Sequence, residues 1–76
     1  MNSQNEQAYK NFLVDIVSEI LEKADEAKEV ESSEFQKGYS YALYEIISLL
    51  IQQSESFNLN KEELGLNHID PESDYL

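Results

Sequence analysis

The sequence predicts an all-α protein, an antiparallel helical hairpin with a short C-terminal helical segment packed on it. Two stretches, from about residue 4 to 29 and from about 34 to 56, repeat apolar residues every three or four positions, and this is the spacing of amphipathic helices. The 76 residues contain one proline and two glycines, the residue types least favourable in helices. A chain of this length suits one domain, so residues 1–76 are expected to form a single helical domain.

The first helix begins at a capping-box pattern, in which Ser3 is the N-cap and Glu6 the third helical residue. Its apolar side consists of Tyr9, Leu13, Ile16, Val17, Ile20, Ala24 and Ala27, widened by Phe12, Val14 and Leu21. The opposite side is a candidate acidic surface formed by Asp15, Glu19, Glu22, Glu26 and Glu29, with Asp25 at its border. This pattern fits an ordinary solvated helix face, and the functional alternative is a surface for a basic partner.

A second capping-box pattern, with Ser33 as N-cap and Gln36 at the third position, starts the second helix. The apolar stripes of the two stretches differ in phase by roughly 80° at 100° per residue, which one straight helix cannot accommodate. A very short turn must therefore separate two helices, and a short connection makes them antiparallel neighbours.

The second helix is apolar on two sides, so it is expected to contact two partners. The larger apolar side is expected to face the first helix, and it consists of Phe35, Tyr39, Ala42, Leu43, Ile46, Leu49, Leu50 and Phe57. The smaller side is formed by Tyr44, Ile47 and Ile51. Either the C-terminal segment or another subunit covers it, and the sequence favours the subunit, which predicts a homodimeric four-helix bundle. The candidate interface residues are Tyr41, Tyr44, Ile47 and Ile51, because exposed tyrosines suit protein interfaces.

Small residues and caps mark two further positions. Gly38 and Ala42 form a small-x-x-x-small pair, which indicates either close approach of the first helix or a tolerated helix glycine. Asn60 is expected to cap a short helix at about 61–64 that Gly65 ends. The C-terminal segment 66–76 follows, with a turn or a second cap at Asp70 and an end that could be loose.

Composition excludes several kinds of partner. The formal net charge is −11, from 16 acidic residues against 5 lysines, and phosphate contacts depend on Lys and Arg. We therefore expect no direct nucleic-acid binding and no attraction to anionic membranes. No apolar run approaches the ~20 residues of a membrane span, the first ten residues are polar, and cysteine is absent. These features together predict a cytoplasmic protein.

No pattern of reactive residues rises above background, so we predict no catalytic, cofactor-binding or metal-binding residues. The single histidine, His68, lacks the Glu-x-x-His spacing of carboxylate metal bundles. The oxygen-rich stretch after Asn67 lacks the central glycine of a calcium loop, and Pro71 interrupts it. A glycine-rich phosphate loop is also missing. The chain is therefore expected not to be an enzyme.

These observations predict a non-catalytic protein–protein interaction module that forms a homodimer. The alternative is an acidic inhibitor, comparable to an antitoxin or immunity protein, that occupies a basic protein surface in the manner of a nucleic-acid mimic. The two hypotheses use different surfaces, since the first depends on the second helix and the second on the acidic side of the first helix.

Overall fold

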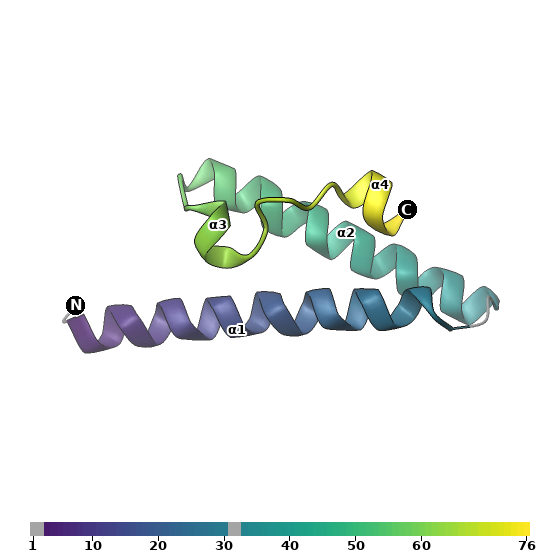
Figure 1. Ribbon diagram of the computed structural model, residues 1–76, viewed down its shortest axis with the longest axis horizontal. Helices are drawn as coiled ribbons and strands as arrows, with labels where there is room; N and C mark the ends of the chain where they lie inside the picture. The colour runs from purple at the N-terminus through teal and green to yellow at the C-terminus, as the bar shows by residue number, and fades with distance from the viewer. Residues whose placement is uncertain (1–2, 31–32) are drawn as a thin grey trace.

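The computed structural model describes residues 3–30 and 33–76, and all regular structure in this part of the chain is helical. The helices are α1 (Ser3–Lys28), α2 (Glu34–Ser56), α3 (Lys61–Leu64) and α4 (Pro71–Tyr75). α1 and α2 run antiparallel as a long hairpin, while α3 and α4 lie beside α2 as the chain returns toward the turn (Figure 1). The molecule is correspondingly elongated, with extents of 47 × 19 × 16 Å. The predicted all-α class is confirmed for the described residues.

The start of α2 follows the predicted cap only in part. The Ser33 backbone is extended and its hydroxyl accepts a hydrogen bond from the Gln36 amide at 3.1 Å. The Gln36 side chain does not return to Ser33; it donates to the carbonyl oxygen of Ala27 in α1 at 3.4 Å. This bond ties the two helices together beside the turn. The cap predicted at Ser3 involves a side chain outside the described part of the structure.

Two adjoining clusters form the core. One contains Ala24 and Ala27 of α1 with Leu43 and Ile47 of α2, and the other joins Val17 to Leu64 and Leu66. The residues that pack around the clusters come from α1, α2 and the C-terminal segment: Leu13, Val14, Ile20, Leu21, Leu50, Ile51, Ile69 and Tyr75. The core therefore lies between the hairpin and the C-terminal segment.

α3 directs the C-terminal segment back across the hairpin. Asn60 accepts a hydrogen bond from the Glu63 amide at 3.2 Å, as predicted for its cap. Gly65 ends the helix with φ 77°, in the left-handed region where glycine is favoured, and the Leu66 amide donates to the Lys61 carbonyl at 2.8 Å. This turn allows Leu64 and Leu66 to enter the same cluster, where Leu66 is only 2 % exposed.

The C-terminal residues form a turn of helix, α4, in place of a loose end. Pro71 occupies its first turn, and the Asp70 amide donates to the Asp74 carboxylate at 2.9 Å. The Lys28 ammonium lies 4.5 Å from the centre of the Tyr75 ring, a cation–π contact between α1 and α4. Partial burial raises the pKa of Tyr75, and the neighbouring Asp25 carboxylate adds to this increase.

The orientation of α2 differs from the one predicted. Phe35, Leu49 and Phe57 were expected to face the core but are 81 %, 53 % and 72 % exposed. The buried side is centred on Ile47, at the edge of the smaller predicted apolar side that lies toward the larger one. α2 must face α1 and the C-terminal segment at the same time, and the side between the two apolar sets meets both. Leu43 and Leu50 alone of the larger side contribute to the core.

Of the two interpretations of Gly38, the structure supports a tolerated helix glycine and not close approach of the first helix. A Cβ atom added at this position would have no neighbour within 4 Å. The small residues that permit close packing of the hairpin are Ala24 and Ala27 of α1, which are 4 % and 6 % exposed. Gly38 is a solvent-facing residue in the second turn of α2.

Candidate interaction surface

α2 carries an exposed apolar stripe along its whole length. The stripe consists of Phe35, Tyr39, Ala42, Ile46, Leu49 and Phe57. Between Phe35 and Leu49 the steps are alternately four and three residues, which is the repeat of a coiled-coil seam. The polar residue Gln53 continues this spacing, and Phe57 lies beyond it. The repeat thus marks one continuous side of the helix that no element of the described chain covers.

α1 contributes an exposed edge of the same character. Phe12 is 67 % exposed and Ile16 is 38 % exposed, one turn apart on the same side of the helix. Partly buried Ile20 and exposed Lys23 continue this line toward the turn of the hairpin. Tyr9, at the other end, lines a shallow hollow with Leu59 and Leu64. We call the α2 stripe together with Phe12 and Ile16 the open face.

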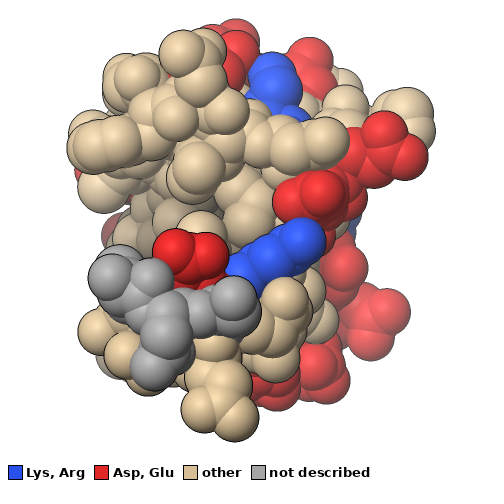
Figure 2. Space-filling model, turned by 90° about the vertical axis from the view of Figure 1, so that its left-hand side faces the viewer, with Lys and Arg blue, Asp and Glu red and all other residues tan. Residues whose placement is uncertain are grey.

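The open face lies on the side of the hairpin opposite the C-terminal segment. On α2, Ser40 and Tyr41 line a hollow with Tyr75 and Leu76 of the C-terminal segment. Ser40 lies roughly 140° around the helix axis from Phe35 of the stripe, at 100° per residue. On α1, Val14 and Leu21 face α3, and Phe12 and Ile16 project on the other side. Figure 2 views the molecule end-on and shows acidic side chains gathered along one side and uncharged residues over much of the other. The hairpin is thus covered on one side only.

The four residues predicted as an interface lie in different environments. Ile47 is 0 % exposed and belongs to the core of the single chain. Ile51 is partly buried against both clusters, so α1 and the C-terminal segment cover this side of α2. Tyr44 is half-buried and Tyr41 is exposed, with their ring centres 5.6 Å apart. Of the four, only the two tyrosines remain available to a partner.

Tyr41 borders the open face together with Glu45. The two residues line one shallow hollow with Ile46 and Leu49, so the polar border and the apolar stripe are continuous. A hydrogen bond to the Glu45 carboxylate, together with its negative charge, raises the pKa of Tyr41. Tyr41 is therefore neutral at physiological pH, and Glu45 is the charged group at this border.

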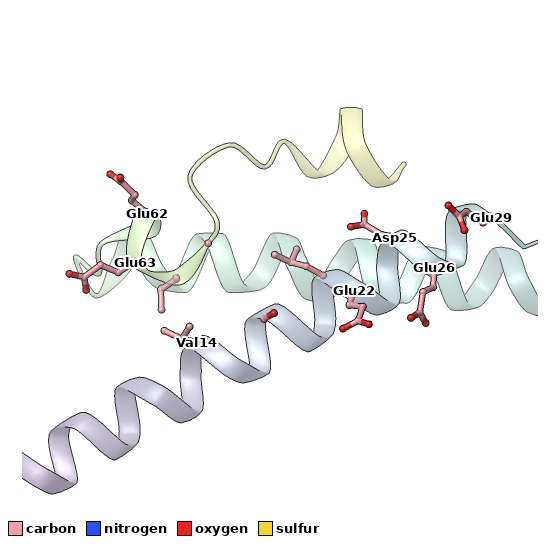
Figure 3. A pocket seen from close by; sticks show the side chains of 11 residues that line it. Val14, Glu22, Asp25, Glu26, Glu29, Glu62 and Glu63 are labelled. Carbon is pink, nitrogen blue, oxygen red and sulfur yellow. The ribbon is translucent and has the colours of Figure 1, made fainter.

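The acidic surface predicted on α1 is wider than one helix. All five predicted acids are exposed, and α3 adds Glu62 and Glu63 to a hollow that also borders Glu22, Asp25, Glu26 and Glu29. Figure 3 shows that these carboxylates do not converge, since Glu62 and Glu63 point outward from α3 and the α1 acids point in several directions. Lys10 pairs with Glu63 at 3.2 Å and Lys28 with Asp25 at 3.6 Å, so part of the charge is neutralised.

The side chains that could ligate a metal ion are scattered in the described part of the chain. No group of three or more His, Asp or Glu side chains in residues 3–30 and 33–76 is arranged to hold a metal ion. His68 is exposed in the loop before α4. No helix in this part of the chain is long and apolar enough to cross a membrane. The most prominent surface features of the described residues are the open face and the exposed carboxylates.

Comparison of the chain with protein-family models, with characterised proteins and with solved structures found no match. The candidate surface consequently depends on the geometry alone. The sequence contained a signal for it, the four–three spacing of the α2 stripe, but the same spacing also suits a residue set that faces an intramolecular core. The stripe was therefore assigned to the core, and Phe12 and Ile16 were assigned to the apolar side of α1.

Proposed function

We propose that this chain is a non-catalytic protein–protein interaction module that binds a second copy of itself through the open face. The exposed apolar stripe on α2 is the observation that carries the proposal. An apolar surface of this extent is unusual on a small monomer unless it binds something, and domains below about 80 residues commonly gain stability by oligomerising.

The size of the open face suits such a contact. If each fully exposed large side chain presents about 150–200 Å², the exposed parts of the open face amount to roughly 600–800 Å². A standard protein interface buries ~800 Å² on each partner. The two surfaces of a homodimer would therefore be large enough for a stable complex. Two hairpins packed this way form a four-helix bundle.

The distribution of charged residues also favours a second copy of the chain, and not a basic protein, as the partner of the open face. Each chain carries a formal charge of −11, so two copies repel unless their acids are far apart. Glu19 lies close to the line of Phe12 and Ile16, so it borders the open face. On the covered side of the hairpin lie the acids that line the hollow: Glu22, Asp25, Glu26, Glu29, Glu62 and Glu63. Face-to-face association of open faces would leave those carboxylates in solvent.

Sedimentation equilibrium on three proteins tests the proposal. The wild type is expected to dimerise in the micromolar range, and Ile46→Glu, which places a charge in the stripe, is expected to be monomeric. Gln7→Glu is the matched control, because it makes the same charge change at an exposed site on the side of α1 turned away from Phe12 and Ile16. A wild type that stays monomeric at high micromolar concentration refutes the proposal.

The acidic hollow supports a second candidate function, an inhibitor that occupies a basic protein surface. The observation that supports this function is that Glu62 and Glu63 of α3 line the same hollow as four acids of α1. Replacing Glu22, Glu26 and Glu62 by Gln is expected to slow association with a basic partner, since charge steering sets the association rate. The control changes Asp15, Glu19 and Glu72, which lie outside the hollow. Equal rates for the two triple variants would refute this function.

A further inference from the structure

We propose that, in the dimer, α2 of each chain packs against α1 of the partner, and that Lys23 pairs with the partner's Glu45 at the border of each contact. This inference rests on the proposed function and deepens it, because it names the arrangement of the two copies. It follows from three features of the open face. These are the positions of its residues along the hairpin axis, the positions of its charged residues, and the unequal apolar content of its two helices.

Packing in the core fixes the position of each residue along the axis of the hairpin. Val17 shares a cluster with Leu50, and Ala24 shares one with Leu43, so these pairs lie at the same level of the hairpin. A two-fold axis parallel to the helices leaves every residue at its own level, so α2 meets the partner's α1 in the register that the hairpin already has. In this register Ile46 reaches the level of the partner's Ile20. Leu49 and Phe57 likewise reach the levels of the partner's Ile16 and Phe12.

The charges on the open face complete this arrangement. Glu19 and Lys23 continue the line of Phe12 and Ile16, about one and two turns beyond Ile16. Three other lysines make ion pairs within the described chain, whereas Lys23 makes none there. Glu45 borders the α2 stripe, also makes no ion pair in the described residues, and lies at the level of Lys23. Packing α2 on the partner's α1 therefore brings opposite charges together twice.

The other symmetric arrangement fits the charges less well. A two-fold axis perpendicular to the helices would pack α2 on the partner's α2. Because Ile46 lies midway between Phe35 and Phe57, that axis would pass near Ile46, and the two Glu45 carboxylates would approach each other. Like charges in such a position repel. Phe12 and Ile16 would then face the C-terminal part of the partner's α1, where exposed Val30 lies near the charged Lys23 and Glu26.

Charge reversal tests the pairing by sedimentation equilibrium at low salt. Lys23→Glu is expected to weaken the dimer roughly tenfold, because two exposed ion pairs are replaced by two repulsions. Lys37→Glu is the matched control, since it makes the same change of charge on the other side of α2, and it should weaken the dimer much less. The double variant Lys23→Glu/Glu45→Lys should restore the wild-type dissociation constant to within about threefold. A double variant as weak as Lys23→Glu overturns the inference and leaves the dimer itself standing.

Crosslinking provides a second readout that does not depend on charge. The chain has no cysteine, so single substitutions give clean probes, and a short bismaleimide is the crosslinker. A mixture of Ile16→Cys and Leu49→Cys proteins is expected to yield a mixed dimer, whereas Ile46→Cys alone should yield almost none. Efficient self-crosslinking of Ile46→Cys overturns the inference in favour of the α2–α2 arrangement. A wild type that sediments as a monomer overturns both this inference and the proposed function.

Discussion

The two sides of α2 have nearly the same composition and opposite surroundings. Ile47 lies on the side that α1 and the C-terminal segment cover and is fully buried, while its neighbour Ile46 lies in the stripe and is 42 % exposed. Both sides are apolar enough to serve as a core. The difference arises because one chain of this length supplies enough apolar surface to cover one side of the hairpin only. What remains uncovered is the surface we assign to the second copy.

The largest expected effect comes from removing the cover of the buried side. Truncation after Gly65 deletes Leu66, Ile69 and Tyr75, all of which pack on the core. A small domain has a total stability of about 5 kcal/mol. Buried Leu66 alone contributes ~2–3 kcal/mol, and partly buried Ile69 and Tyr75 add smaller amounts, so the truncated chain is expected to be largely unfolded. Far-ultraviolet circular dichroism measures this. Deletion of exposed Leu76 alone is the control, and a fully folded truncation would contradict the assignment of the core.

A pair of alanine substitutions compares the two sides directly. Ile47→Ala should lower the free energy of unfolding by about 2–4 kcal/mol, because it leaves a cavity in a packed cluster. Ile46→Ala should lower it by less than ~1 kcal/mol at protein concentrations where the monomer dominates. Urea denaturation at low concentration measures both. Equal losses would mean that Ile46 is as buried as Ile47 in the single chain.

Gly38 allows a stabilising change on the exposed surface of α2. Gly38→Ala is expected to raise the free energy of unfolding by about 0.5–1 kcal/mol, because the helix gains a residue of higher propensity and the new Cβ meets no atom within 4 Å. Thermal melts of the two proteins measure the gain. A loss of stability would indicate that an element approaches this position after all.

The smallest expected effect concerns pH and the contact between α4 and the hairpin. The raised pKa of Tyr75 means that the folded state holds its proton more tightly than the unfolded chain. This contribution to stability is complete below the unfolded pKa of about 10 and is lost as the pH rises through the folded pKa. Wild type should therefore lose more stability than Tyr75→Phe between pH 9 and 11. Parallel losses in urea titrations would show that Tyr75 is as exposed in the folded chain as in the unfolded one.

Local signals predicted most of the fold. The two long periodic stretches, the caps at Ser33 and Asn60 and the left-handed glycine at Gly65 each depend on a few adjacent residues, and each is found in the structure. The rotation of α2 about its axis depends on residues distant in sequence. Ile47 packs in one cluster with Ala24 and Ala27 of α1, against which Ile69 and Tyr75 of the C-terminal segment also pack. These distant residues turn Ile47 inward and leave Phe35 outside. A hydrophobic pattern shows which sides are apolar but not which one a short C-terminal segment will cover.

The candidate site was harder to predict for the same reason. Tyr41 was predicted as an interface residue because it is an exposed tyrosine on a helix, and it borders the open face. Tyr44 was predicted from the smaller apolar side of α2 and is half-buried. Ile47 was assigned to an interface because it belongs to the smaller apolar set, yet packing within the chain requires it. The acidic surface of α1 was evident from its spacing, whereas the contribution of Glu62 and Glu63 depends on where α3 packs.

The central claim is that the open face is exposed in one chain and covered by a second copy, and the methyl groups of Ile46 and Ile47 test it side by side. A soluble paramagnetic agent broadens NMR signals of exposed methyl groups, and the measurement is made at low and at high protein concentration. Ile47 should be protected at both. Ile46 should be broadened in dilute solution and protected when concentrated. Equal broadening of Ile46 at the two concentrations, with the protein folded throughout, would contradict the claim.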